Sequence, residues 1–284
     1  MKLVLGTVQF GLNYGINNAV GAPNKEQIFS ILDHAYEAGI RELDTADAYG
    51  TSQERLAEYF QARGQKFQLM SKFSLDGTTT IAQHLQNSLK RLGTSRIEGY
   101  YFHKFEDFKT FRNFDAFENL KAQGLINKLG VSLYTDDELA LAAENPTIDV
   151  IQLPFNLLDS GDSKLRLMEK AKKNKKLLYA RSAFLQGLFF MKQESFSGKL
   201  RSMASPVQQI QTLAKMHHLS TADLALSFVL AHPLIDKVLI GVDTVEQLQC
   251  NLMALGKAVS PELLNQLKKI KIEDPALLNP GNWK

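Results

Sequence analysis

Residues 25–63, KEQIFSILDHAYEAGIRELDTADAYGTSQERLAEYFQAR, contain the structural unit from which the fold can be predicted. Apolar residues at 28, 31, 32, 35 and 36 have helical spacing, and Gly39 suits the C-cap of a helix over 25–38. The short run from Ile40 to Asp44 is typical of a buried strand, and residues 52–63 again have a helical pattern. Helix, strand and helix in this order indicate a parallel sheet whose strands are connected by helices.

The same alternation continues outward in both directions along the chain. Strands are predicted at 3–7, 40–44, 67–72, 99–103, 128–132, 149–153, 177–182 and 237–241. Helices are predicted at 25–38, 52–63, 81–92, 111–123, 136–144, 164–174, 207–217, 221–231, 245–255 and 261–270, with a coil as the tail. Eight units favour a closed (β/α)8 TIM barrel over an open doubly wound sheet, with extra helices near the C-terminus. No composition break divides residues 1–284, so we expect a single domain.

Composition narrows the functional classes. Apolar residues make up 44 % and charged residues 22 %, and the net charge of +3 includes no run of five like charges. We therefore expect no nucleic-acid partner, no membrane partner and a cytoplasmic protein. The single cysteine, Cys250, excludes an internal disulfide and a cysteine-based zinc site, and no metal is expected. Its position in a helical pattern predicts a thiol packed in the core.

Five consecutive predicted strands end in a polar residue. Since the C-terminal ends of barrel strands form the usual active site, these side chains are expected to meet at one mouth. A strand-end Asp is usually a helix cap and a strand-end Lys is usually solvated, but five together are hard to explain as surface chemistry. The five residues are Asp44, Lys72, His103, Ser132 and Gln152.

Tyr49 lies five residues beyond Asp44, in a loop that can carry its phenol over the barrel mouth. A free tyrosine has a pKa near 10, and a nearby ammonium such as Lys72 would lower it. Asp44 would keep Lys72 charged, and His103 would hydrogen-bond a substrate oxygen. This set suits proton transfer to a carbonyl oxygen, and a redox reaction would also need a bound hydride carrier.

The chain resembles the aldo-keto reductase family over nearly its full length, and four segments resemble the family's motifs. They are LDTADAYG at 43–50, SLKRLG at 88–93 followed by His103, GLI at 124–126 with LGVS at 129–132, and QLPFN at 152–156. The resemblance implies a tetrad of Asp44, Tyr49, Lys72 and His103, with Tyr49 as general acid in reduction, and a small-molecule carbonyl substrate. It also implies a monomer or weak oligomer. The chain resembles the subgroup that lacks the N-terminal hairpin. Because that hairpin usually plugs the barrel floor, the plug is expected to be absent or replaced.

The resemblance further implies NADP(H), with NAD(H) as the alternative, lying across the barrel mouth. The residues that match cofactor positions are Gly6, Thr7, Ser132, Gln152, Arg181, Ser182, Phe184, Gln186, Gly187, Gly241, Asp243, Gln247 and Asn251.

Several of these positions depart from the family pattern. Arg181 stands where an aromatic ring usually stacks on the nicotinamide, and Leu133 replaces a carboxamide-binding Asn. Gly241 and Gln247 stand where cations often hold the 2′-phosphate. Asp243 could accept a hydrogen bond from a ribose hydroxyl, although a cap of the following helix is the simpler interpretation. No strand is followed by the Gly-x-Gly-x-x-Gly turn of a Rossmann fold.

Two other functions remain open from sequence. One is a non-redox lyase with a Schiff base on Lys72, which a nearby Asp44 disfavours because it raises the lysine pKa. The other is a cofactor-sensing regulatory barrel. Substrate specificity is expected from the loops at 13–23, 104–110 and 184–205. Four aromatic residues could make an apolar wall there, or could equally be core: Phe10, Tyr14, Phe105 and Phe184.

Overall fold

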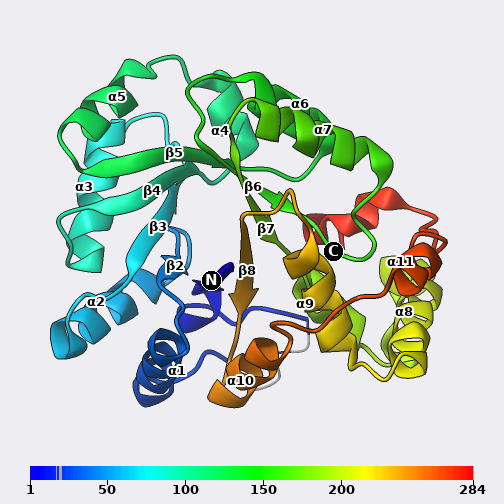
Figure 1. The fold of residues 1–284 in the computed structure, drawn as a ribbon. Coiled ribbons are helices and arrows are strands. Elements are labelled where there is room, and N and C mark those ends of the chain that lie inside the picture. Colours follow the sequence, from blue (N-terminus) through cyan, green and yellow to red (C-terminus); the bar gives the residue numbers. More distant parts are fainter. Residues whose placement is uncertain (17, 19–20, 284) are drawn as a thin grey trace.

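A computed structural model describes residues 1–16, 18 and 21–283. Eight strands in the described residues form a closed parallel barrel in the order β1 to β8, which confirms the predicted TIM barrel. Figure 1 shows helices arranged around the outside of this barrel. The strands are β1 Leu3–Gly6, β2 Glu42–Asp44, β3 Gln68–Phe73, β4 Ile97–Phe102, β5 Ile126–Ser132, β6 Val150–Pro154, β7 Leu177–Arg181 and β8 Lys237–Gly241.

Several helices begin at a residue whose side chain caps the first turn. Capping boxes start four of them, with Asn24, Thr80, Thr135 and Ser220 as N-caps, and Gly93 ends one in the left-handed conformation. No helix among the described residues is long and apolar enough to cross a membrane. The helices are α1 Lys25–Glu37, α2 Ser52–Arg63, α3 Ile81–Leu92, α4 Phe105–Thr110, α5 Asp115–Ala122, α6 Asp136–Glu144, α7 Asp162–Lys173, α8 Ala204–Met216, α9 Thr221–Ala231, α10 Val245–Met253 and α11 Pro261–Leu267.

Three predicted elements differ from the structure. The helix expected at 111–123 begins only at Asp115, as α5, because residues 111–114 are not helical and pack Phe111 and Phe114 into an aromatic cluster; α4 lies before it, in the segment expected to be a loop. The loop at 184–205 contains three 3₁₀ helices, and the tail contains two short 3₁₀ turns at 275–278 and 280–282. These segments bury apolar side chains, including Leu188, Met203 and Leu277, in a second core with α8 and α11.

The barrel interior is filled by inward-facing side chains of the strands. Tyr101 lies within it beside Val4, Met70, Val150 and Tyr179, all buried. The Tyr179 hydroxyl donates to Glu42 Oε2 at 3.1 Å, and Lys237 forms an ion pair with the same carboxylate. The interior below the mouth is therefore packed by the barrel's own residues, and the open space lies above the strand ends.

Candidate active site

Lys72 connects Asp44 with Tyr49 at the mouth of the barrel. The register pairs Asp44 on β2 with Met70 on β3, which puts Lys72 one inward-facing position further toward the mouth. The Lys72 ammonium forms an ion pair with Asp44 Oδ1 and lies 3.3 Å from the Tyr49 hydroxyl. Three of the four residues of the predicted tetrad are thus joined by hydrogen bonds.

The pair of Lys72 and Asp44 is held by further polar contacts that exclude water. Lys72 Nζ also donates to the Thr45 carbonyl at 3.2 Å, and Gln152 Nε2 donates to Asp44 Oδ2 at 2.8 Å. Lys72 is 1 % exposed and Asp44 is 3 % exposed. Because both Asp44 oxygens have donors, this buried carboxylate is fully satisfied. Gln152, predicted to bind a carboxamide, therefore orients Asp44.

Burial and charge act on the site in opposite directions. Burial lowers the pKa of Lys72, but the charges of Asp44 and Tyr49 outweigh it, so the pKa is raised and the lysine stays protonated. Burial raises the pKa of the Tyr49 phenol, and the Lys72 charge offsets this only in part. Lys72 thus acts in the expected direction, but the net pKa of Tyr49 is raised. Desolvation of the phenol is the larger effect.

His103 completes the site opposite Tyr49. It directly follows β4, and its ring centroid lies 5.6 Å from that of Tyr49 in an edge-on arrangement. Burial, followed by the charges of Lys72 and Arg181, lowers the pKa of His103 to about 3. The imidazole is therefore neutral near pH 7, and its ring N–H can donate to an oxygen held beside the Tyr49 hydroxyl.

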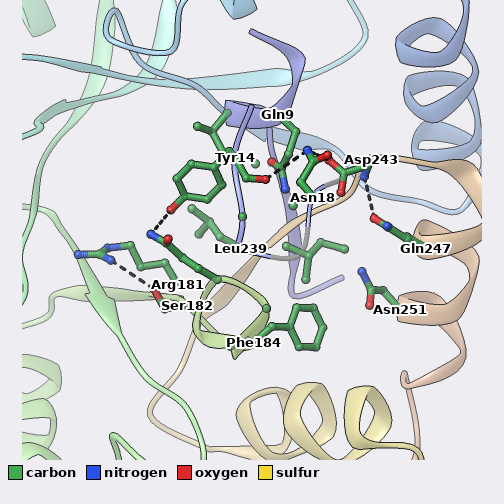
Figure 2. Close-up of a pocket in the computed structure, with 18 of the residues that line it drawn as sticks. Gln9, Tyr14, Asn18, Arg181, Ser182, Phe184, Leu239, Asp243, Gln247 and Asn251 are labelled. Carbon is green, nitrogen blue, oxygen red and sulfur yellow. Dashed lines mark hydrogen bonds between the residues drawn. The ribbon is translucent and has the colours of Figure 1, made fainter. Parts of the chain in front are cut away.

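A groove of about 500 Å³ runs from Tyr49 across the ends of β7, β8 and β1. Most of the predicted cofactor residues line it, whereas Ser132, Lys72 and His103 do not. In Figure 2, Tyr14 and Arg181 lie toward one end, and Asp243, Gln247 and Asn251 lie toward the other. The predicted residues that line the groove are Gly6, Thr7, Gln152, Arg181, Ser182, Phe184, Gln186, Gly187, Gly241, Asp243, Gln247 and Asn251.

The wall after β7 has an unusual backbone. Leu185, Gln186 and Gly187 are consecutive residues with positive φ, at 46°, 53° and 92°, and Ser182 also has a φ of 61°. Such conformations cost free energy in residues other than glycine, and they cluster at ligand-binding sites. Within this segment the Leu185 N–H donates to the Ser182 carbonyl at 2.9 Å, and the Gly187 N–H donates to the Phe184 carbonyl at 2.9 Å.

The opposite end of the groove carries acidic and neutral side chains. Thr244 caps α10, so the expectation that Asp243 caps it is wrong. Asp243 instead accepts a hydrogen bond from Asn18 Nδ2 at 3.2 Å, while its own backbone N–H donates to Gln247 Oε1 at 2.8 Å. Burial raises the pKa of Asp243, and Glu246 lines the groove nearby.

The loop after β1 contributes Tyr14, which the sequence suggested as a wall residue, and Gln9, which it did not. The Tyr14 hydroxyl accepts from Gln186 Nε2 at 2.7 Å, which ties this loop to the wall after β7. Gln9 is buried against Gly241, and its Oε1 atom has no partner among the described residues. A Cβ at 241 would lie 2.3 Å from Gln9 Nε2, so the missing side chain at 241 makes room for this amide.

One sequence-based expectation about the groove is wrong, one open alternative is decided, and one falls partly outside the described residues. Cys250 is exposed and lines the groove, so it is not a core thiol, because α10 turns this position away from the barrel. Phe10 and Phe105 are core residues, 2 % and 5 % exposed, whereas Tyr14 and Phe184 line the groove. Part of the predicted 13–23 specificity loop, residues 17, 19 and 20, lies outside the described residues.

Comparison with known proteins gives one consistent result. The sequence profile of the aldo/keto reductase family matches residues 2–272. The oxidoreductase YqkF of Bacillus subtilis, whose role is uncharacterised, is 28 % identical and aligns over 89 % of this chain and 90 % of its own length. The D-threo-aldose 1-dehydrogenase of a Pseudomonas species is 23 % identical over 84 % of this chain and 87 % of its own. A structure assigned as an aldo-keto reductase from Pseudomonas aeruginosa has a TM-score of 0.65 at 22 % identity, covering 89 % and 88 % of the two chains, and shows the same fold.

Proposed function

This chain belongs to the aldo/keto reductase family of oxidoreductases, and we propose that it reduces an aldehyde, ketone or sugar-like carbonyl with a nicotinamide dinucleotide, using Tyr49 as the proton donor. The observation that carries this proposal is the hydrogen bond from Lys72 to the Tyr49 hydroxyl at the end of the groove. The D-threo-aldose 1-dehydrogenase among the relatives is named for a sugar carbonyl, which supports the sugar-like class.

The residues of the site divide the work of proton transfer. Because Lys72 donates to the Tyr49 oxygen, that oxygen is the acceptor and its own proton is free for a substrate oxygen. A carbonyl oxygen between Tyr49 and His103 would receive hydrogen bonds from the phenol and from the neutral imidazole. The bound reduced cofactor would supply the hydride to the carbonyl carbon, and Tyr49 would deliver the proton to the oxygen.

The groove fits a dinucleotide along its length. The positive-φ segment after β7 lines it with Ser182, Gln186 and Gly187, and the unpartnered Gln9 amide oxygen can accept from a ribose hydroxyl. At the far end, Asp243 and Glu246 supply negative charge, and none of the described groove residues there is cationic. We therefore propose that a 2′-phosphate is not required and that NADH is accepted alongside NADPH.

The charge state of Lys72 disfavours the Schiff-base alternative. A Schiff base forms from a neutral amine, but the pKa of Lys72 is raised by Asp44 and Tyr49. The ammonium also has Asp44, Thr45 and Tyr49 as acceptors, and one of the three would lose its donor if the ammonium were deprotonated.

The first prediction tests Tyr49 directly. Tyr49→Phe should lower turnover by about 100- to 10,000-fold, because general acid catalysis contributes about that much. Dinucleotide affinity should stay near the original value, since the hydroxyl serves the carbonyl. Consumption of NADH and NADPH at 340 nm with an aldehyde and sugar panel gives turnover, and fluorescence titration gives affinity. A Tyr49→Phe variant that keeps half of the turnover would contradict the proposal. If the unmodified protein binds the dinucleotide but turns over none of the substrates, a regulatory role would be favoured.

A further inference from the structure

Arg181 is the only cationic residue among the described residues that line the groove. It ends β7, and its side chain lies toward the same end of the groove as Tyr14, away from Asp243 and Gln247 (Figure 2). Nη2 donates to the Leu133 carbonyl at 2.7 Å, Nη1 contacts Ser182 Oγ at 3.3 Å, and the guanidinium lies 4.0 Å from the centre of the Tyr134 ring. All three partners are neutral.

The guanidinium has no carboxylate partner among the described residues, and the nearby carboxylates are already paired. Asp159 forms an ion pair with Lys164, and Asp44 forms one with Lys72. Burial raises the pKa of Asp159, and the charges of Lys164 and Arg181 lower it. The Nε atom of Arg181 is buried without a partner. A half-buried cation surrounded by neutral groups favours the binding of an anion.

The anion would lie in the same groove as the reacting carbonyl, because Arg181, Tyr14 and Tyr49 all line it. In keeping with this, the Arg181 charge lowers the pKa values of Tyr49 and His103, although burial is the main influence on both. Burial raises the pKa of Tyr14 to about 12, so its hydroxyl stays protonated. Since that hydroxyl accepts from Gln186, its proton can be donated to a ligand.

We propose that Arg181 and Tyr14 bind the anionic group of the substrate, and that the preferred substrates are aldehydes or ketones that carry a carboxylate. The planar guanidinium can donate two parallel N–H bonds to a carboxylate, and the Tyr14 O–H adds a third donor. The choice of substrate rests on the proposed reductase function, whereas binding of the anion does not.

Matched substrate pairs test the proposal. The carboxylate pair is 4-carboxybenzaldehyde and benzaldehyde, and the phosphate pair is glyceraldehyde 3-phosphate and glyceraldehyde. For the unmodified protein, we expect the ratio of kcat/KM to favour the carboxylated member. In Arg181→Gln this ratio should fall by about 10- to 100-fold, mainly through KM, because charge-assisted hydrogen bonds are lost. Tyr14→Phe should lower it less.

Arg166→Gln is the matched control, because Arg166 is exposed on the outer helix α7 and its substitution removes the same charge. It should leave the ratio unchanged. An unchanged ratio in Arg181→Gln, or a loss limited to dinucleotide affinity, would overturn the proposal, since the guanidinium would then serve the cofactor. A preference found only in the phosphate pair would overturn the carboxylate assignment.

A binding measurement separates this proposal from the reductase proposal. Calorimetric titration with benzoate and benzamide needs no turnover. Benzoate should bind the unmodified protein at least about 10-fold more tightly than benzamide, and Arg181→Gln should abolish the difference. Thermal unfolding of the variant checks that it is folded, and Arg181→Lys should retain part of the preference. Equal affinity for benzoate and benzamide would overturn the anion site even if reduction is observed.

Discussion

Lys72 has three ammonium protons, and the structure provides an acceptor for each of them. Asp44 Oδ1, the Thr45 carbonyl and the Tyr49 hydroxyl surround the nitrogen. A lysine that is 1 % exposed keeps its charge only because these partners replace water. Its location thus makes the lysine both the electrostatic partner of the phenol and the group that orients its proton outward.

The second prediction concerns this residue. Burial raises the pKa of Tyr49 and Lys72 counteracts it, so Lys72→Met should raise the phenol pKa further. In alcohol oxidation the phenolate accepts the proton, so activity increases as pH rises through the phenol pKa. In Lys72→Met this increase should occur at a higher pH than in the unmodified protein. Turnover should also fall, by about 100-fold or more. pH–rate profiles in the oxidative direction measure this, with Asp44→Asn as the comparison that keeps an amine at 72. An unchanged profile in Lys72→Met would contradict the electrostatic role.

At the scale of single elements, α10 shows how one helix start serves two purposes. Thr244 caps the helix by accepting from the Gln247 backbone N–H, so the side chains of Asp243 and Gln247 remain available to the groove. The positive end of the helix dipole lies here, but the negative charges of Asp243 and Glu246 offset its positive potential. This arrangement separates the cap, which is structural, from the residues that we propose select the cofactor.

The third prediction tests cofactor choice at this helix. Gln247→Arg should shift the ratio of NADPH to NADH affinity toward NADPH by about 1–2 kcal/mol, because one charged hydrogen bond to the 2′-phosphate is added. Fluorescence titration with both cofactors measures the ratio. Gln249→Arg places the same charge on the same helix but outside the groove, and it should shift the ratio much less. Equal shifts in both variants would place the 2′-phosphate elsewhere.

At the scale of the whole molecule, the barrel closes around one large side chain. Tyr101 is fully buried, and its ring lies against the backbone of Gly99 on its own strand and of Gly130 on β5. A Cβ at 130 would approach Tyr101 Cδ1 to 2.4 Å, and a Cβ at 99 would approach Cε1 to 2.6 Å. Glycine is required at these positions because of the volume of the tyrosine, and the packed interior supports the strand ends that carry the site.

The fourth prediction follows from this packing. Gly130→Ala should lower the free energy of unfolding by about 1–3 kcal/mol, since the added methyl group overpacks a rigid interior. Denaturant unfolding measures the loss, and a second substitution, Tyr101→Leu, should recover part of it. Gly161→Ala is the control, because a Cβ there meets nothing within 4 Å. A loss no larger than that of Gly161→Ala would mean that the interior can relax around the ring.

The sequence alone was sufficient to predict the barrel and to name Asp44, Lys72 and Tyr49. Strand–helix alternation is a local pattern, and parallel strands in a barrel bring their C-terminal ends together by geometry. The three linked residues could therefore be expected at one mouth before any distance was known. His103 was expected there for the same reason, and it lies edge-on to Tyr49.

Only the tertiary structure decided which side chains face the groove and what charge state they have. Cys250 and Phe105 have ordinary patterns in the sequence, and their exposure depends on how α10 and α4 are rotated against the barrel. The roles of Tyr14 and Gln9 depend on a loop that crosses to residues more than 150 positions away. The raised pKa of Tyr49 depends on burial, a property of the assembled site, whereas periodicity and motifs depend on near neighbours in the chain.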